Sequence, residues 1–468
     1  MSAQEYDVVV IGSGPGGYVA AIRASQLGFK TACIEKEKTL GGTCLNVGCI
    51  PSKALLQSTE HFAWIQHSAS EQGINCTGLS VNFPQMMKRK VDVVQSLTQG
   101  VSGLFKRHNV THIQGTARFI SSQTIEISNG NNKSAAKQKI TAKHFILATG
   151  SEPIPLPFLN FDEKLVLSST GALSLAQIPK KMIVVGGGVI GVELASVYNR
   201  LGTEVVIVEM LEGICVAMDD AVSKTLLQVL KKQGISFYLG AKVIESTQDK
   251  KGICLKIEQN GQKLDLSADV VLVAVGRRPY SAGLGLQEIG ITMQKGLVAV
   301  DNNFRSSVPN IYAIGDLIEG PMLAHRASEE GCAVAEILAG HKPRLNYMAI
   351  PNVIYTHPEV ASLGLTEKEA RATGADIVIG TASFRGNPRA RCAGDMEGFV
   401  KVIGAGKEGY LVGMHIIGPQ ASELVNGGVV AIEKRATLRQ IAGYPHAHPT
   451  LSEAIKEACG NALGIAIH

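Results

Sequence analysis

The fold is decided by residues 6–35, which read YDVVVIGSGPGGYVAAIRASQLGFKTACIE. The Val- and Ile-rich run at Tyr6–Ile11 is typical of a buried parallel strand. A glycine turn, a helical stretch and a second apolar run follow it, and the second run ends at Glu35. This order predicts a βαβ unit that binds a dinucleotide. The glycines of the turn are Gly12, Gly14 and Gly17.

The G-x-G-x-x-G spacing indicates a dinucleotide site only when a strand precedes it and a helix and a second strand follow it. With 51 glycines in 468 residues, about 0.6 G-x-G-x-x-G matches are expected by chance. The second match lies in residues 182–209, MIVVGGGVIGVELASVYNRLGTEVVIVE, and repeats every part of the first. Gly12 to Glu35 and Gly186 to Glu209 both span 23 residues, so the unit is an internal repeat. The glycines of the second unit are Gly186, Gly188 and Gly191.

The third match, Gly404, Gly406 and Gly409, lies between two strand-like runs with no helix between them, so we predict a hairpin turn there. In the first two units the glycines would form the tight turn, admit a pyrophosphate and let the helix pack on the strand. The alternative is a pair of glycine turns that bind nothing. Glu209 favours NAD over NADP, because a carboxylate repels a 2′-phosphate and Met210-Leu211-Glu212 offers no cation.

Composition excludes several classes of protein. Hydrophobic residues make up 45% and charged residues 18%, which predicts a core-forming chain of roughly three domains. The net charge of +5 is too small to suggest a nucleic acid or an anionic membrane as partner. There is no apolar run of about 20 residues and no leader-like start, so we expect a cytoplasmic protein or a mature organellar matrix form. No Cys-x2-Cys or His-Glu-x-x-His occurs, so we expect no metal.

The reactive element is residues 41–53, GGTCLNVGCIPSK. On an ideal helix the Cα atoms of Cys44 and Cys49 would lie roughly 8.7 Å apart, and a disulfide needs less than about 7 Å. A bond between them therefore requires a distorted backbone, which Gly48 permits. A bond closing so short a loop adds little stability, which favours a redox role. The alternative is two buried free cysteines.

Residues 41–53, placed between two dinucleotide-binding units, resemble the pyridine nucleotide–disulfide oxidoreductases, and the resemblance covers nearly the whole chain. The segments His446–Ala454 and Gly276–Pro279, together with Glu209, resemble the members that act on dihydrolipoamide. The resemblance implies FAD in the first site and NAD in the second. It also implies an enzyme that oxidises protein-bound dihydrolipoamide to lipoamide through a Cys44–Cys49 disulfide and FAD, with NAD as electron acceptor.

The resemblance assigns the catalytic roles residue by residue. Cys49 is the flavin-facing thiol, and Cys44 exchanges with the substrate. His448 is the general base and Glu453 orients it, although Thr450–Glu453 also fits a capping box, and the two roles can coexist. We treat His446 as structural.

The resemblance also assigns cofactor contacts. Lys53 lies by the flavin, with Glu193 as its ion-pair partner. From the residues alone, Asp316 could instead cap a helix, and Arg277 and Arg278 could belong to a solvated or structural turn. The further FAD contacts are Gly115, Ala117, Thr149, Gly150, Asp316, Met322 and Ala324. The further NAD contacts are Val243 and Gly276.

The expected fold class is α/β, with two Rossmann-like dinucleotide-binding domains and a C-terminal α+β interface domain. The expected domains are residues 1–150 for FAD, 151–276 for NAD, 277–348 completing the FAD domain, and 349–468 for the interface. The resemblance implies a homodimer in which the partner subunit supplies the base. It also implies lipoyl domains of a 2-oxoacid dehydrogenase complex, or a glycine-cleavage protein, as partners. The polar stretch 129–139 is expected to form an exposed hairpin loop.

Two other functions are consistent with parts of the sequence. An NADPH-using disulfide reductase of the glutathione or mercuric-ion type shares the 41–53 motif. Glu209 argues against it, and the tail carries only Cys459 rather than a terminal cysteine pair. A non-catalytic flavin-bearing scaffold subunit is the second alternative. The intact Cys44, Cys49 and His448 argue against that function.

Overall fold

The computed structural model describes residues 4–128, 138–249 and 252–468, so most of the predicted 129–139 loop lies outside the described residues. The chain forms two compact units. The first comprises residues 1–54, 87–154 and 276–345, and the second comprises residues 55–86, 155–275 and 346–468. None of the described helices is both long enough and apolar enough to span a membrane.

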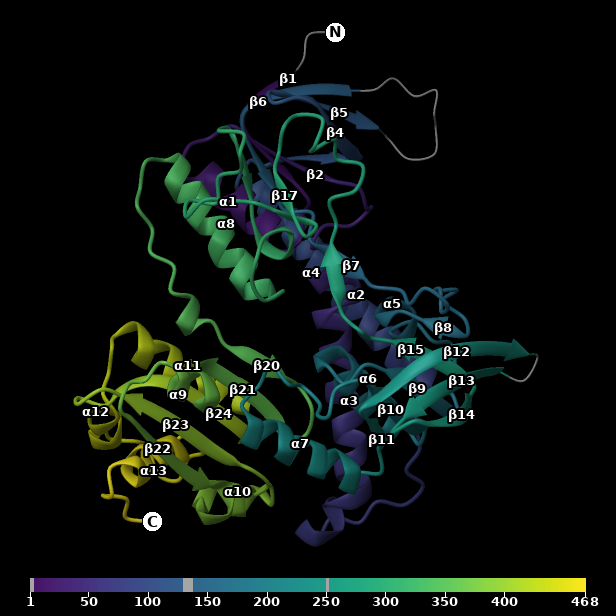
Figure 1. The fold of residues 1–468 in the computed structure, drawn as a ribbon, viewed down its shortest axis with the longest axis vertical. Coiled ribbons are helices and arrows are strands. Elements are labelled where there is room, and N and C mark those ends of the chain that lie inside the picture. The colour runs from purple at the N-terminus through teal and green to yellow at the C-terminus, as the bar shows by residue number, and fades with distance from the viewer. Residues whose placement is uncertain (1–3, 129–137, 250–251) are drawn as a thin grey trace. The chain divides into compact units, whose positions relative to one another are not determined.

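The first unit is built on a seven-stranded sheet (Figure 1). Its parallel strands follow the order β3-β2-β1-β6-β19, and β5 and β4 continue the sheet antiparallel from the first half of β6. The central parallel strands β1, β2 and β19 and the last residues of β6 are buried apolar runs, whereas β3 at the edge is polar and largely exposed. The strands are β1 Gln4–Ile11, β2 Thr31–Glu35, β3 Thr111–Gln114, β4 Thr116–Ser121, β5 Thr124–Ser128, β6 Gln138–Leu147 and β19 Ile311–Ala313.

Helices α1 (Pro15–Gln26) and α8 (Ala324–Leu338) lie side by side in this unit (Figure 1). They cross closely because both carry glycine at the contact: a Cβ on Gly331 would lie 2.5 Å from the carbonyl oxygen of Gly16. Three more helices follow β2 along the chain: α2 Gly42–Val47, α3 Cys49–His67 and α4 Phe83–Arg107. Short pairs complete the unit: β7 Ser151–Pro153 with β16 Arg277–Pro279, and β17 Met293–Gln294 with β18 Leu297–Val298.

The second unit contains a parallel sheet of the order β11-β10-β9-β15-β8. The four neighbouring strands β11-β10-β9-β15 correspond in order to β3-β2-β1-β6 of the first unit. The internal repeat seen in the sequence is therefore also a repeat of topology. Its strands are β8 Val166–Leu167, β9 Lys181–Val185, β10 Glu204–Glu209, β11 Ser236–Leu239 and β15 Val270–Val273. Its helices are α5 Ser169–Ala172, α6 Val189–Arg200 and α7 Asp220–Lys232. An antiparallel sheet follows: β12 Ala241–Asp249, β13 Gly252–Gln259 and β14 Gln262–Ala268.

The C-terminal part of the second unit is an antiparallel sheet, β20-β21-β24-β23-β22, with helices α9 to α13. The third glycine match joins β23 to β24, and Gly406 and Gly409 both have positive φ, 73° and 66°. The predicted hairpin turn is therefore confirmed, as is the predicted α/β fold class. The strands are β20 Asn352–Ile354, β21 Glu359–Gly364, β22 Ile377–Ser383, β23 Phe399–Ala405 and β24 Tyr410–Gly418. The helices are α9 Glu367–Ala372, α10 Pro388–Ala393, α11 Ala421–Glu433, α12 Leu438–Gly443 and α13 Glu453–Ala462.

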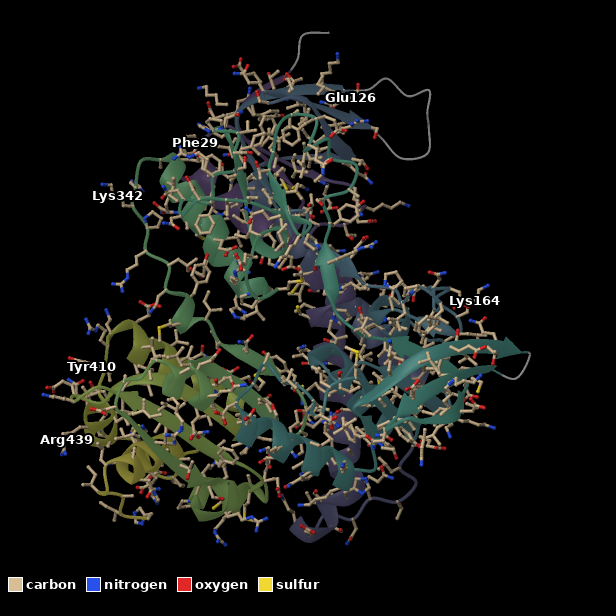
Figure 2. The ribbon with its side chains drawn as sticks, viewed as in Figure 1. Phe29, Glu126, Lys164, Lys342, Tyr410 and Arg439 are labelled. Carbon is tan, nitrogen blue, oxygen red and sulfur yellow. The ribbon has the colours of Figure 1, made fainter. Side chains whose placement is uncertain are left out.

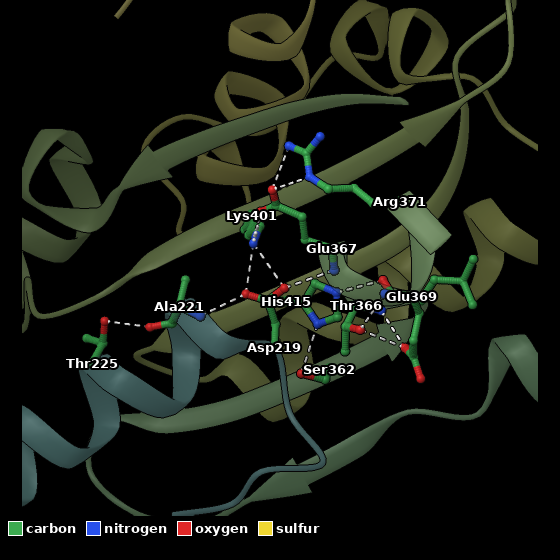
Figure 3. A network of polar contacts seen from close by, with 11 residues as sticks. Asp219, Ala221, Thr225, Ser362, Thr366, Glu367, Glu369, Arg371, Lys401 and His415 are labelled. Carbon is green, nitrogen blue, oxygen red and sulfur yellow. Dashed lines mark hydrogen bonds and ion pairs between the residues drawn. The ribbon is translucent and has the colours of Figure 1, made fainter. Parts of the chain in front are cut away.

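A buried ion pair ties α7 to this sheet (Figure 3). Lys401 Nζ on β23 lies 2.8 and 2.9 Å from the two carboxylate oxygens of Asp219 and 2.8 Å from Glu367 Oε2. Asp219 is the N-cap of α7 and accepts a hydrogen bond from the Ala221 N–H. Burial opposes ionisation, but the hydrogen bond from Lys401 leaves the pKa of Asp219 below its usual value. The pair therefore stays charged inside the protein.

Candidate functional site

The first glycine turn is shaped by packing. A Cβ on Gly12, where φ is +99°, would lie 2.4 Å from the Ala148 carbonyl oxygen, and a Cβ on Gly17 would lie 1.9 Å from the Gly12 carbonyl oxygen. Gly14, the N-cap of α1, differs, because a Cβ there would meet only a Cα atom of Gly42, at 4.0 Å. The backbone at Gly14 is thus open to approach at a helix N-terminus, which fits a pyrophosphate group.

Glu35 closes this turn. Its Oε2 accepts hydrogen bonds from the Ser13 N–H at 2.9 Å and the Ser13 hydroxyl at 2.6 Å, and its Oε1 accepts one from the Glu37 N–H. The Glu35 carbonyl oxygen also accepts a 2.8 Å hydrogen bond from the Gly115 N–H. Gly12, Glu35 and Gly115 therefore meet at one edge of the sheet. Ala117 is buried on β4, two residues further on.

The second glycine turn reproduces the first. A Cβ on Gly186 would lie 2.4 Å from the Ala274 carbonyl oxygen, and a Cβ on Gly191 would lie 2.0 Å from the Gly186 carbonyl oxygen. At Gly188, the N-cap of α6, an added Cβ would meet nothing within 4 Å. The second turn therefore has the same open backbone as the first, at the same place relative to its helix.

Glu209 repeats the role of Glu35. Its Oε2 accepts a 2.6 Å hydrogen bond from the Gly187 N–H, and its Oε1 accepts one from the Leu211 N–H at 2.8 Å. Its carboxylate is thereby fixed at the end of β10, beside the turn. Val243 lies on β12 with 7% of its surface exposed and belongs to the apolar core of the second unit.

Three further predicted FAD contacts, Thr149, Gly150 and Asp316, lie just after the ends of β6 and β19. The Thr149 hydroxyl donates a 2.6 Å hydrogen bond to the Tyr280 carbonyl oxygen, and the Gly150 carbonyl oxygen accepts one from the Tyr280 N–H. Asp316 follows β19 and accepts a hydrogen bond from the Ser151 hydroxyl. Arg277 Nε donates a 2.8 Å hydrogen bond to the same hydroxyl.

The hydrogen bonds that link Arg277, Ser151 and Asp316 were not predicted from the sequence. Arg277 lies on the short strand β16, not in the turn that the sequence left as an alternative, and burial lowers the pKa of its guanidinium group. The available signal was the position of Ser151 directly after Thr149-Gly150 at a strand end.

Three predicted contacts remain more loosely placed. Met322 is 36% exposed and lies two residues before Ala324, the first residue of α8. Gly276, predicted to line the NAD site, belongs to the first unit, whereas Gly188 and Glu209 belong to the second. Neither unit by itself brings Gly276 to the rest of that site.

The helical segment that carries Cys44 and Cys49 is interrupted between the two cysteines, as their spacing in the sequence predicts. Helix α2 ends at Val47, Gly48 follows, and α3 begins at Cys49. A Cβ on Gly48 would lie 2.9 Å from the Thr43 carbonyl oxygen, so the break needs a glycine. The side chains of Cys44 and Cys49 are hydrogen-bonded to one another. The predicted distortion is confirmed, and the two sulfur atoms are neighbours across it.

The surroundings control the charge of these thiols. The hydrogen bond with Cys49 and burial hold the pKa of Cys44 far above its ordinary value, while the Lys53 ammonium acts in the opposite direction. Lys53 lies one turn along α3 from Cys49. Its predicted partner Glu193 belongs to the other unit, where it is 3% exposed and accepts a 2.9 Å hydrogen bond from the Tyr355 N–H.

His448 and Glu453 meet at the start of α13. His448 Nδ1 lies 2.9 Å from Glu453 Oε1, and Glu453 Oε2 accepts a 2.8 Å hydrogen bond from the Thr450 N–H. The Glu453 carboxylate therefore contacts both the histidine and the turn before α13, but the predicted capping box does not form, because the N-cap is Ser452 and no side chain caps the helix. The Thr450 N–H is the main cause that lowers the pKa of Glu453, with His448 adding to it against the effect of burial. The His448 side chain is 68% exposed, while His446 Nδ1 lies 3.0 Å from the Tyr444 carbonyl oxygen.

No group of three His, Cys, Asp or Glu side chains that could hold a metal ion occurs among residues 4–128, 138–249 and 252–468. The described residues provide two reactive pairs, a cysteine pair and a histidine–carboxylate pair. They also provide two glycine turns that are suited to binding pyrophosphates.

Comparisons with known proteins agree with this geometry. Residues 6–331 match the family described as pyridine nucleotide-disulphide oxidoreductase, and residues 350–459 match its dimerisation domain. The chain is 48% identical to the mitochondrial dihydrolipoyl dehydrogenase of Schizosaccharomyces pombe, covering 98% of this chain and 91% of that protein. It is 44% identical to a leghemoglobin reductase of Glycine max, and the match covers 97% of this chain and 87% of that protein.

Solved structures with the same fold include LpdA from Mycobacterium tuberculosis, with a TM-score of 0.89 and 25% identity over 98% of this chain and 99% of that one. The HOCl-induced flavoprotein disulfide reductase RclA from Escherichia coli, solved as a Cu(II) complex, gives a TM-score of 0.86 at 25% identity and the same coverage. The whole architecture is therefore shared with flavoprotein disulfide reductases.

Proposed function

This chain belongs to the pyridine nucleotide-disulphide oxidoreductase family, and from that membership we propose that it oxidises protein-bound dihydrolipoamide to lipoamide and reduces NAD. The observation that carries the proposal is the Cys44–Cys49 pair, held in contact across the α2–α3 break and following a dinucleotide turn. Relatives with the dihydrolipoyl dehydrogenase activity are 46–48% identical over nearly the full chain.

Two cofactors belong to this function, FAD and NAD. The glycine turns fit them, because Gly14 and Gly188 leave the backbone open at two helix N-termini. When bound, FAD takes an electron pair from the dithiol and passes it to NAD as hydride. The FAD contacts would come from Gly12, Gly14, Gly17, Glu35, Lys53, Gly115, Ala117, Thr149, Gly150, Asp316, Met322 and Ala324. The NAD contacts would come from Gly186, Gly188, Gly191, Glu209, Val243 and Gly276, and Glu193 would pair with Lys53.

The residues of the chain perform the thiol chemistry. His448 accepts the proton of one dihydrolipoamide thiol, and the resulting thiolate attacks the sulfur of Cys44 in the oxidised enzyme. The Cys44–Cys49 bond breaks, a mixed disulfide forms with Cys44, and Cys49 leaves as a thiolate. The second substrate thiol then attacks the substrate sulfur of the mixed disulfide, the bond from that sulfur to Cys44 breaks, and the proton of this thiol passes to the departing Cys44 thiolate. Lipoamide is released, and the enzyme carries the two electrons on Cys44 and Cys49.

The charges around each group support these roles. Deprotonation of the substrate leaves a positive imidazolium at His448, and the Glu453 carboxylate 2.9 Å from its Nδ1 stabilises that charge. The Cys49 thiolate is favoured by its place at the first turn of α3 and by Lys53 four residues later.

Domain limits and partners are part of the same proposal. We propose an FAD-binding region of residues 1–150 and 277–348, an NAD-binding region of 151–276 and an interface region of 349–468. The match to a dimerisation domain supports a homodimer. The lipoyl domain of a 2-oxoacid dehydrogenase complex, or a glycine-cleavage protein, would present the substrate. The mitochondrial names of several relatives support an organellar matrix, with the cytoplasm as the alternative location.

The test is steady-state turnover of dihydrolipoamide by the FAD-loaded protein with NAD and, separately, with NADP. We expect NADH formation with NAD and a preference for NAD over NADP. Oxidised glutathione with NADPH is the matched assay for the rival reductase. Turnover in that assay without turnover of dihydrolipoamide would exclude the proposed function.

A further inference from the structure

An exposed arginine cluster lies in the C-terminal part of the second unit. Arg385, Arg389 and Arg391 occur within seven residues, on the turn Phe384–Gly386 and on α10, and no acidic residue stands between them. All three are exposed. Arg385 is 72% exposed and lies 3.8 Å from Glu397 Oε2, whereas Arg389 and Arg391 make no ion pair with any residue that the structure describes. We call these three residues the arginine surface.

The arginine surface is fixed to the histidine turn by a buried asparagine. Asn387, 5% exposed, accepts a hydrogen bond from the Ala390 N–H with its Oδ1 and so caps α10. Its Nδ2 donates a 2.9 Å hydrogen bond to the carbonyl oxygen of Thr450. Thr450 is the residue whose N–H binds Glu453, the partner of His448. Arg385 and Arg389 each stand two residues along the chain from Asn387, which is joined directly to the turn that carries His448.

Other acidic groups near α10 do not neutralise this surface. Asp395, just beyond α10, lies 3.9 Å from His357 Nε2, and burial raises the pKa of its carboxyl group. Glu453 is engaged by His448 and by Thr450. The guanidinium groups of Arg389 and Arg391 are therefore available for an external anion.

We propose that the arginine surface docks an acidic face of the protein domain that carries the lipoyl group. This inference rests on the proposed function, because only a substrate attached to a carrier protein needs a docking surface beside the base. Guanidinium groups bind carboxylates in a bidentate way. Charges at the rim of an interface mainly raise the association rate, and their effect falls as salt is added.

The test compares a carrier-bound substrate with the free one. The probes are a purified, reduced lipoyl domain with an acidic surface and free dihydrolipoamide, each assayed with the FAD-loaded enzyme and NAD. In the double variant Arg389→Glu/Arg391→Glu we expect kcat/KM for the lipoyl domain to fall at least about ten-fold at low salt, within the range of electrostatic steering. The difference should shrink in high salt. Because free dihydrolipoamide is neutral, its kcat/KM should change less than about two-fold.

Arg439→Glu is the matched control. It reverses an exposed arginine on α12, which Figure 2 places away from α10 in the same domain. The control should leave both substrates unaffected. Equal kcat/KM values for wild type and the double variant on the lipoyl domain would overturn the docking inference, whereas failure of the wild type on both substrates would overturn the proposed function itself. A change of oligomeric state in the double variant would place the arginine surface in a subunit interface and also overturn the inference.

Discussion

At the scale of single residues, Cys44 and Cys49 are expected to differ although they are neighbours. Cys44→Ser and Cys49→Ser should each abolish lipoamide turnover, because each removes one sulfur of the exchanging pair. In Cys44→Ser the remaining Cys49 thiolate should donate charge to oxidised flavin and give a long-wavelength absorption band. Cys49→Ser should lack that band. Absorption spectra of the two FAD-loaded variants decide the matter, and equal spectra would show that the roles are not as proposed.

Glu209 should set the choice of nucleotide. Replacing it with Gln removes a charge that would face a 2′-phosphate, and two charges about 4 Å apart interact by about 4 kcal/mol at an effective dielectric constant of 20. We expect the ratio of kcat/KM for NAD to that for NADP to fall at least about ten-fold. A Gln side chain has one acceptor oxygen and can keep only one of the hydrogen bonds from Gly187 and Leu211, so the unfolding temperature of the variant is measured alongside to check that the turn persists. An unchanged ratio would mean that the carboxylate does not contact the ribose.

At the scale of elements, the break between α2 and α3 depends on one glycine. In Gly48→Ala the new methyl group would lie 2.9 Å from the Thr43 carbonyl oxygen, so the backbone must shift between the two cysteines. We expect dihydrolipoamide turnover to fall roughly 10- to 100-fold, as for other displacements of reacting groups. Gly100→Ala on α4 is the control, since its Cβ would meet nothing within 4 Å. It should keep full activity and gain up to about 1 kcal/mol of stability. Equal turnover in both variants would contradict the role of Gly48.

The elements also show what the sequence could and could not predict. The two glycine turns, the broken helix at Gly48 and the hairpin at Gly404–Gly409 were predictable because their causes lie within a few residues. The Asn387–Thr450 hydrogen bond joins residues 63 positions apart, and the Arg277–Ser151 hydrogen bond joins residues 126 apart. Such contacts follow from the packing of segments that are distant along the chain, which no local pattern encodes. The roles of His448 and Glu453 came from family resemblance rather than from spacing.

At the scale of the whole molecule, the proposed homodimer makes a sharp prediction. If His448 acts on Cys44 of the other subunit, mixing inactive Cys44→Ser protein with inactive His448→Gln protein should restore activity once subunits exchange. A mixed dimer then holds one site with both residues intact. A general base contributes about 10² to 10⁴ in rate, so recovery would stand far above background. Absence of recovery despite verified exchange would place the base within its own chain.

The buried Lys401–Asp219 pair should hold the second unit together. Lys401→Met leaves Asp219 buried without its cation, and breaking such a pair costs about 3–5 kcal/mol of unfolding free energy. Denaturant unfolding measures it. Asp219→Asn/Lys401→Met, which removes both charges, should recover much of the loss, and no recovery would show that the charges are not the cause.

The pH dependence of that loss follows from two opposite shifts. The pKa of Asp219 is lowered on folding, so its contribution is lost as pH falls below about 3.9, the ordinary value. The pKa of Lys401 is raised, because its bonds to Asp219 and Glu367 outweigh burial, so its contribution is lost above about 10.4. The difference between wild type and Lys401→Met should therefore be constant from about pH 5 to 9.

The same ion pair has a consequence for protein engineering. Asp219 belongs to the proposed NAD-binding segment, and its cation stands 182 residues later on the C-terminal antiparallel sheet. A graft that transplants residues 151–276 alone into another scaffold would leave behind both the counter-charge of Asp219 and the sheet that packs against α7. This Rossmann-like segment is therefore not a self-standing building block. Recombination between relatives should place its crossover points so that Asp219, Glu367 and Lys401 are inherited from one parent.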